Sequence, residues 1–511
     1  MTNSPSTNSR AGRREWTALA VLMLPLLLVS MDVSVLYFAV PSISADLEPT
    51  GTQQLWIFDI YAFVLAGLLM TMGALGDRIG RRKLLLIGAA AFGAASVWAA
   101  YADSAGMLIA ARAVLGIGGA TLMPTTMALV RNMFRDDKQR ATAIGIWSGV
   151  MTGGIALGSV MSGVLVEHFW WGSVFLVNLP AMVLLLVLAP VLLPEFKSPA
   201  PGRFDLLGVP LSMAAVLPLV YGIKEIPSEG FEPAYVASIL VGLFFGVLFV
   251  RRQRTVVSPM ISPALFRGRG FGPAVALNLI QAFAMMGSAY FTTQYIQAVL
   301  GKSALEAALW ALAPSVFIGF AAPVATVLVQ RGVSRGAVVT AGFLTSACGY
   351  VLLVLTGTDS LWTVLAGAGV LASGAVIVGS QLTDLALGAA PAEAAGAASS
   401  LLETGQEFGG ALGMAVLGSI GTAVYRRGLG DAPAGARETL GGALETARHL
   451  PGRAGEVLLA SAREAFTDGM HVAALAGTVV LVAAAVLAAR GLRVTATPER
   501  SPEPEPEAAT V

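Results

Sequence analysis

The feature that most constrains this chain is the recurrence of apolar runs about as long as a membrane is thick. A helix needs roughly 20 mostly apolar residues to cross a bilayer, and fourteen segments meet that requirement. Each must be a helix, because lipid cannot satisfy open backbone groups. The sequence therefore predicts an all-α integral membrane protein with spans near 16–40, 53–75, 83–102, 106–130, 141–165, 171–193, 205–225, 233–251, 271–298, 304–329, 337–356, 361–387, 397–424 and 470–490.

The composition excludes several other classes of protein. Only 12% of the 511 residues are charged, whereas soluble domains carry roughly 25%. The net charge of +1, with no separate basic segment, argues against a nucleic-acid partner. The single cysteine, Cys348, excludes a disulfide framework and a cysteine-rich metal site. The first apolar run carries Asp32 and is too long for a cleaved signal peptide, so we expect a retained span.

The distribution of Lys and Arg predicts the orientation of the chain. With fourteen spans, most of these 32 residues fall on the side that holds both termini, which is therefore expected to be cytoplasmic. Short outer loops then hold only Lys224 and Lys302. The segment 425–469 is expected to form an outer hairpin of two short amphipathic helices, 434–450 and 454–465. The predicted organisation is a tail (1–15), a six-helix bundle (16–195), two additional helices (205–251), a second six-helix bundle (271–490) and a disordered tail (491–511).

Away from their ends, the predicted spans keep six ionisable residues, and such side chains are costly and usually face the bundle interior. Asp32 and Arg112 lie at similar depths on a rise of ~1.5 Å per residue, so we expect them to pair. Two of the acids are four residues apart and share one helix face. Such acids can also simply hydrogen-bond across helices or, near a span end, be solvated. The set is Asp32, Asp59, Arg112, Asp384, Glu403 and Glu407.

Acids outnumber bases by five to one in this set, which favours a cavity for lipophilic cations. Burial and a nearby cation act on a carboxyl group in opposite directions, which suits carboxylates to proton coupling. We expect no metal site. No nucleotide-binding loop or nucleophile motif is present either, which argues against an enzyme and against ATP as the energy source.

A basic turn joins the second and third predicted spans. It reads Gly-Ala-Leu-Gly-Asp-Arg-Ile-Gly-Arg-Arg-Lys over residues 73–83. This pattern resembles the signature loop of the major facilitator superfamily. A weaker echo at residues 330–335 indicates two related halves, as expected for such transporters.

Further stretches narrow the resemblance. Residues 31–41, 56–61, 112–120 and 395–409 are similar to motifs of the fourteen-span drug:proton antiporter-2 family, closest to its quaternary-ammonium and dye exporters. The resemblance covers about residues 16–490. It implies a monomer in the bacterial cell membrane that exports lipophilic, preferentially cationic compounds, with the proton gradient in place of a cofactor.

The resemblance also implies roles for particular residues. Serines stand in span five where the family usually has Pro and Gly, and Gly319 stands where some members carry an acid for divalent cations. The implied sets are Asp32, Asp59 and Arg112 for proton coupling; Trp56, Asp59, Tyr61, Glu403 and Glu407 for substrate binding; Gly73, Asp77, Arg78, Gly80 and Arg81 for a conformational gate; and Gly154, Gly158, Ser159 and Gly163 for the antiporter helix.

Two other functions stay open at this point. The chain could export a single antibiotic, neutral or anionic, for self-protection, although the acidic cavity argues mildly against this. It could also be a membrane receptor or channel, against which the paired halves and the loop motif argue.

Overall fold

The computed structural model describes residues 11–134, 136–197, 205, 207–256, 259, 265–266, 270–389, 395–430, 432–451 and 453–492. Thirteen helices in this part of the chain are long and apolar enough to cross a membrane, and Ile318–Gln330 is a shorter apolar helix. The predicted all-α membrane fold is confirmed. Most of the two predicted tails lies outside the described residues.

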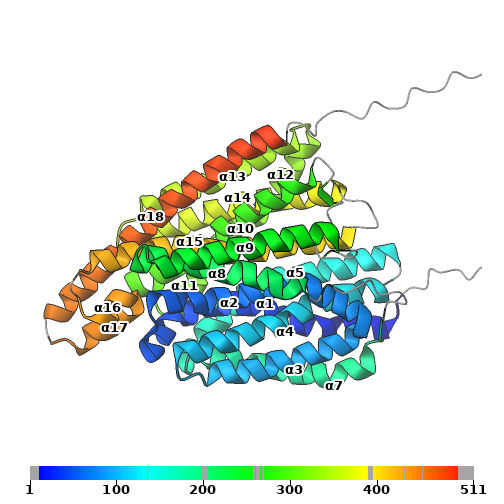
Figure 1. Cartoon of the computed structure of the whole chain (residues 1–511), viewed down its shortest axis with the longest axis horizontal. Helices are drawn as coiled ribbons and strands as arrows, with labels where there is room; N and C mark the ends of the chain where they lie inside the picture. Colours follow the sequence, from blue (N-terminus) through cyan, green and yellow to red (C-terminus); the bar gives the residue numbers. More distant parts are fainter. Residues whose placement is uncertain are drawn as a thin grey trace, which may run out of the picture.

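The helices follow one another as two groups of spans with a pair between them (Figure 1). The first group is α1 (Arg13–Leu47), α2 (Gly51–Ile79), α3 (Arg81–Ala100), α4 (Ala105–Met133), α5 (Asp137–His168), α6 (Ser173–Leu176) and α7 (Asn178–Leu192). The pair is α8 (Gly208–Glu229) and α9 (Pro233–Thr255). The second group is α10 (Phe271–Gln294) with a π-helical turn (Tyr295–Val299), α11 (Ala304–Leu312), α12 (Ser315–Gln330), α13 (Arg335–Val354), α14 (Leu361–Ala389), α15 (Ala395–Gly428), α16 (Ala434–Glu438), α17 (Leu440–His449) and α18 (Arg453–Gly491).

Local signals set the beginnings and ends of several helices. Thr50 begins α2 with a capping box. Its hydroxyl accepts from the backbone amide of Gln53, and the side-chain oxygen of Gln53 accepts from the backbone amide of Thr50. Ser104 and Ser334 cap α4 and α13 in the same way through their hydroxyls. Gly80, with φ +111°, ends α2 in a backbone conformation that favours glycine.

The tenth span is not the single helix that the sequence predicted over 304–329. It is broken between α11 and α12 at Ala313–Pro314. Pro314 has no N–H to donate to the carbonyl of Trp310, which instead accepts from Ala313 at 3.0 Å. The proline therefore tightens the chain into a turn between two apolar helices.

The predicted outer hairpin also differs from the structure. The segment forms α16 and α17, but the stretch expected as a second short helix, 454–465, is the beginning of α18. That helix continues unbroken for 39 residues into the last span, and it contains no proline. The helix that follows α17 is therefore continuous with the last span.

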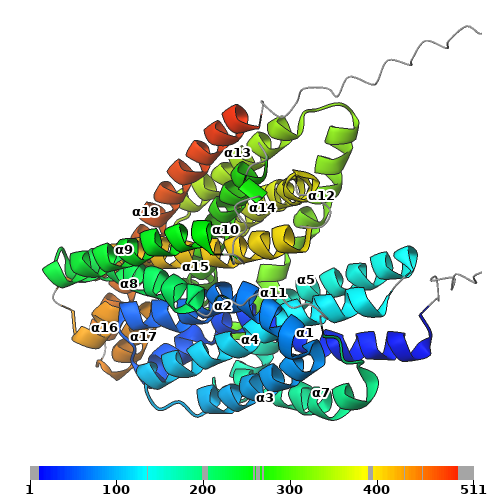
Figure 2. The same ribbon diagram turned by 45° about the vertical axis from the view of Figure 1, so that its right-hand side comes forward.

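The two groups of spans form two bundles that meet at one end of the molecule. We call this the hairpin end, because α16 and α17 lie there, and the opposite end, where α1 begins and α18 finishes, the terminal end (Figure 1). At the hairpin end, a Cβ on Gly163 would lie 2.6 Å from the Cα of Leu305, and one on Gly51 would lie 2.5 Å from the Thr422 side chain. Figure 2 shows the ribbons of the two bundles diverging towards the terminal end.

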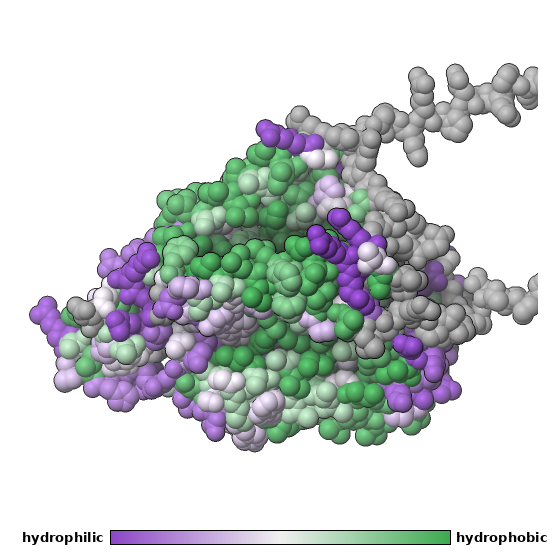
Figure 3. All heavy atoms as spheres, viewed as in Figure 1, coloured by the Kyte–Doolittle hydropathy of each residue, from purple (hydrophilic) through white to green (hydrophobic). Residues whose placement is uncertain are grey.

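The helix α8 packs along the seam between the bundles, against α2 of the first and α15 of the second. A small apolar cluster holds it there, formed by Phe63, Val220, Ala411 and Ala415. Its partner α9 exposes Leu240, Phe244 and Val247. On the face seen in Figure 3, apolar residues cover the middle and many hydrophilic residues lie towards the two ends, as expected for a surface that meets lipid.

Candidate functional site

A buried ion pair joins α1 to α4 inside the first bundle. The Arg112 guanidinium lies 2.5 Å from a carboxylate oxygen of Asp32, donates to the carbonyl of Ile57 at 3.1 Å, and stacks on the Tyr61 ring at 4.6 Å. The pair predicted from depth is confirmed. The second carboxylate oxygen of Asp32 is buried and has no hydrogen-bond partner among the described residues.

A second buried ion pair joins α2 to α8. The Nζ of Lys224 lies 2.7 Å from Oδ2 of Asp59, and the two residues are only 0% and 2% exposed. The distance is short, but the angles are not those of a hydrogen bond, so neither atom has a hydrogen-bond partner among the described residues. The contact is an ion pair without a well-aligned hydrogen bond.

This pair corrects two expectations from the sequence. Lys224 does not lie in an outer loop, because α8 continues beyond it to Glu229, and Arg112 is not the single base of the buried set, because Lys224 lies beside Asp59. The buried acids therefore face two bases. A signal for this was present: Val216, Val220 and Lys224 follow each other at intervals of four on one helix face, and both valines belong to the apolar cluster at the seam.

Two aromatic residues of α2 each cover the cation of one ion pair. The Trp56 ring lies under the Lys224 ammonium at 4.3 Å, whereas Tyr61 lies against Arg112. Both were predicted to contact substrate. In the structure each covers a cation of the protein instead, and the Tyr61 hydroxyl is buried without a hydrogen-bond partner among the described residues.

The two glutamates of α15 lie on the other side of the seam. Glu403 and Glu407 are partly buried, and neither has a hydrogen bond or an ion pair with another described residue. Phe408, the residue after Glu407, packs against Phe63 of α2 with 6.0 Å between the ring centroids, so this part of α15 lies against the first bundle. The Gln281 amide of α10 is also buried, with both polar atoms unpartnered in the described part of the chain.

Asp384 does not belong to this constellation. It lies near the end of α14 and is exposed. It has no hydrogen bond or ion pair with the described residues at the seam. It is therefore a suitable carboxylate control outside the site. Within the described residues, no cluster of three His, Cys, Asp or Glu side chains could hold a metal ion.

The loop predicted as a gate is fixed by a carboxylate that the sequence analysis missed. Asp77 and Arg81 form an ion pair across the turn. Glu195, after α7, accepts from the backbone amides of Arg82 at 3.0 Å and Lys83 at 3.2 Å, which suits the positive end of α3. A Cβ on Gly80 would lie 2.7 Å from the Glu195 carboxyl group.

The other two members of the predicted gate make few contacts. Arg78 is exposed, and a Cβ on Gly73 would meet only Pro124, at 3.8 Å. The structure therefore brings the gate residues together around Asp77, Gly80 and Arg81, while Gly73 and Arg78 flank them.

The antiporter helix α5 packs its small residues against α1. Cβ atoms at Gly154 and Gly158 would lie 2.7 and 2.4 Å from the serine side chains of α1. Ser162 donates to the carbonyl of Val35 at 2.6 Å, whereas the hydroxyl of Ser159 turns back to its own helix, at Ile155. Ser162 thus forms a hydrogen bond between α5 and α1, and Gly163 contacts α11 of the second bundle.

The hairpin ties the second bundle to the first at the hairpin end. Glu438 accepts from the amide of Gly51 at 3.2 Å and lies 3.5 Å from Arg426. Beneath it, the amide of Gln54 donates to the Tyr290 hydroxyl at 2.7 Å. Gly51, Gln54, Tyr290 and Glu438 line a cavity of only about 20 Å³. With the close approach of the bundles at Gly51 and Gly163, this leaves the seam closed at this end.

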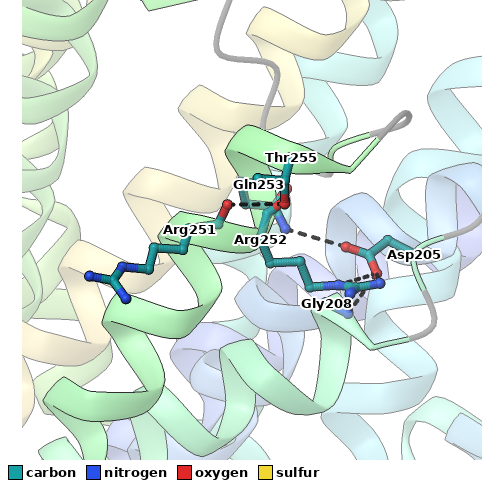
Figure 4. A network of polar contacts seen from close by, with 6 residues as sticks. All are labelled: Asp205, Gly208, Arg251, Arg252, Gln253 and Thr255. Carbon is teal, nitrogen blue, oxygen red and sulfur yellow. Dashed lines mark hydrogen bonds and ion pairs between the residues drawn. The ribbon is translucent and has the colours of Figure 1, made fainter.

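At the terminal end, Asp205 holds the accessory pair together (Figure 4). It accepts from the Arg252 guanidinium at 2.6 and 2.8 Å and from the Gly208 amide at 2.9 Å. Burial works to raise the pKa of Asp205, but the bonds from Arg252 and Gly208 outweigh it and lower that pKa below its ordinary value. The carboxylate therefore stays charged and links α8 to the end of α9.

Comparison with known proteins places this architecture. A model of the Major Facilitator Superfamily matches residues 22–414. The chain is 42% identical over 493 residues to the multidrug efflux pump LfrA of Mycolicibacterium smegmatis, covering 95% of this chain and 97% of that protein. It is 36% identical over 411 residues to the methyl viologen resistance protein SmvA of Salmonella typhimurium, covering 79% of this chain and 82% of that protein.

Two more distant matches extend the comparison. The tetracenomycin C resistance and export protein of Streptomyces glaucescens is 32% identical over 423 residues, covering 81% of this chain and 77% of that protein. The solved structure of a bacterial homologue of the human lysosomal transporter Spinster matches with a TM-score of 0.67 at 18% identity, covering 95% and 98% of the two chains, which shows a shared fold. The chain therefore belongs to the Major Facilitator Superfamily, and it is an integral membrane transporter rather than an enzyme.

Proposed function

We propose that the protein is a proton-coupled exporter of lipophilic, preferentially cationic drugs from the bacterial cytoplasm. The observation that carries this proposal is the set of carboxylates within the spans: Asp32 and Asp59 are buried and each meets a cation, whereas the partly buried Glu407 has no cation partner among the described residues. The similarity to a multidrug efflux pump and to a methyl viologen resistance protein supports drugs as the substrate class.

The proposed orientation has both termini in the cytoplasm, so that the hairpin end faces outwards. With that end closed and the bundles diverging at the other, the seam receives drug from the cytoplasm or the inner leaflet. Glu407 and Glu403 attract the cation. After the bundles rock about the seam, a proton from outside neutralises Asp32, frees Arg112 from it, and resets the carrier as the drug leaves.

The gate residues have a part in this cycle. The Asp77–Arg81 pair, with Glu195 on the first turn of α3, stabilises one arrangement of the terminal end. Nothing in the mechanism requires a second copy, so a monomer suffices. Gly319 leaves open space on α12, where an acid could have served divalent cations, so we expect dications to be carried less well than monocations.

The test is ethidium accumulation in inside-out vesicles whose interior is made acidic. Wild-type protein is expected to accumulate the dye with the gradient, Asp32→Asn to lose this response, and Asp384→Asn to retain it. Absence of gradient-driven accumulation in a folded, inserted wild type would overturn proton-coupled cation export.

A second candidate is export of one antibiotic. The resistance proteins for tetracenomycin C, methylenomycin A and puromycin among the relatives favour it. A transport panel of neutral, anionic and cationic compounds separates the two: activity confined to one compound would support this candidate over the multidrug exporter.

A further inference from the structure

The feature that the mechanism above leaves unused is Lys224. It belongs to the accessory helix α8, outside both six-helix bundles, yet its ammonium is fully buried at the seam. It contacts a carboxylate, Asp59, at 2.7 Å and an aromatic face, Trp56, at 4.3 Å. A carboxylate with an aromatic face is also the combination that recognises organic cations, including quaternary ammonium groups.

We propose that Lys224 is a tethered cation that occupies the seat of the cationic substrate, formed by the Asp59 carboxylate and the Trp56 ring, and that an incoming drug displaces it. This inference rests on the proposed function. It makes Lys224 a specificity-determining residue: it keeps the buried carboxylate neutralised while the transporter is empty, and only a cation can replace it there.

The geometry around the ammonium fits an occupant that can leave. An ammonium has three N–H donors, but that of Lys224 has no aligned hydrogen bond among the described residues despite its short contact with Asp59. Its four-carbon stem is flexible. The charge of Glu225, the next residue on α8, also acts on it, so a displaced ammonium keeps a nearby counter-charge.

A row of aromatic rings connects this seat to the free acid of the second bundle. Trp56 and Phe63 lie 6.5 Å apart between centroids, and Phe63 and Phe408 lie 6.0 Å apart. Phe408 directly follows Glu407, and Phe63 packs in the apolar cluster that holds α8. These ring contacts pack the part of α15 that carries Glu407 against the part of α2 that carries Trp56.

The alternative is that Lys224 only anchors α8 to α2. The two roles predict opposite effects of Lys224→Met, which removes the charge and keeps an unbranched side chain. Displacement predicts that purified protein binds tetraphenylphosphonium about tenfold more tightly, because the competitor is gone, with binding of a neutral drug unchanged. A pure anchor predicts weaker binding of both ligands, whereas a lower unfolding temperature follows from either role, because Asp59 is left buried without its cation. Lys302→Met, in a loop, is the control.

A second variant keeps the inference testable if Lys224→Met does not fold. Trp56→Leu removes the aromatic face, so displacement predicts about tenfold weaker binding of tetraphenylphosphonium and unchanged binding of the neutral drug. Unchanged affinity for the cation would overturn the inference.

These binding measurements are separate from the proposed function. Wild-type vesicles that accumulate ethidium, together with a folded Lys224→Met protein that gains no affinity, would refute the tethered cation alone. Wild-type vesicles without gradient-driven accumulation would refute the exporter itself.

Discussion

The buried acids of the two bundles differ in their partners. In the first bundle, Asp32 and Asp59 each lie against a protein cation, Arg112 or Lys224. In the second, Glu403 and Glu407 have no such partner among the described residues. A paired carboxylate is satisfied without ligand and must be released, whereas an unpaired one must take a proton, water or a bound cation. On the proposed mechanism, the first bundle carries the switch and the second attracts the substrate.

The largest expected effect breaks a pair in the first bundle. Arg112→Gln leaves Asp32 buried without its cation, which we expect to cost about 3–5 kcal/mol of stability and to abolish transport. Adding Asp32→Asn removes the orphaned charge, so the double variant should regain most of the stability but not the proton coupling. Thermal unfolding and vesicle uptake measure the two properties. A double variant no more stable than the single one would contradict the pairing.

The next effect concerns the unpaired acids. Glu407→Gln is expected to weaken binding of monovalent cations about tenfold, the equivalent of 1.4 kcal/mol, because it removes a partly buried negative charge from the part of α15 that lies against α2. Glu403→Gln, one helical turn further from the Phe408–Phe63 contact, should have a smaller effect. Binding titrations with a cationic and a neutral drug provide the measurement, and equal losses for both ligands would show that the charge is not what matters.

The loops of the two bundles allow a matched comparison of glycines. Gly80 and Gly332 both have positive φ, +111° and +93°, but Glu195 lies 2.7 Å from a Cβ on the first and nothing lies within 4 Å of one on the second. Alanine should cost about 1–3 kcal/mol at Gly80 and less at Gly332. Unfolding temperatures test this order; equal values would mean that Glu195 moves aside freely.

The smallest expected effect is on an ion pair outside the spans. The pKa of Asp205 is lowered in the folded protein. The ionised carboxylate therefore adds to the free energy of unfolding above the unfolded carboxyl pKa of about 4, and this stabilisation is lost as the pH falls through the lower folded pKa. Asp205→Asn should therefore destabilise the protein by about 1 kcal/mol near pH 7. The difference from wild type should shrink in acid. Unfolding temperatures across pH measure it, with Asp384→Asn as the control; a difference that does not change with pH would exclude the charge as its cause.

The sequence by itself determined the membrane fold, the two related halves and one ion pair. Apolar length is a local property that lipid selects directly, so hydropathy alone identified the spans. Asp32 and Arg112 could be matched because both lie well inside long spans, where depth follows from counting residues. The signature loop at 73–83 was legible because its glycine and charges act within a single turn.

Only the tertiary structure decided what lies across the seam. The partner of Asp59 depends on how α8 is rotated and docked, and a long lysine side chain near a span end can turn either to water or inwards. The capping of α3 by Glu195 depends on the return of the chain after α7. The closed hairpin end likewise depends on contacts between residues such as Gly51 and Glu438, far apart in the chain. In each of these contacts the two residues lie far apart in the chain, so no short window of sequence contains both of them.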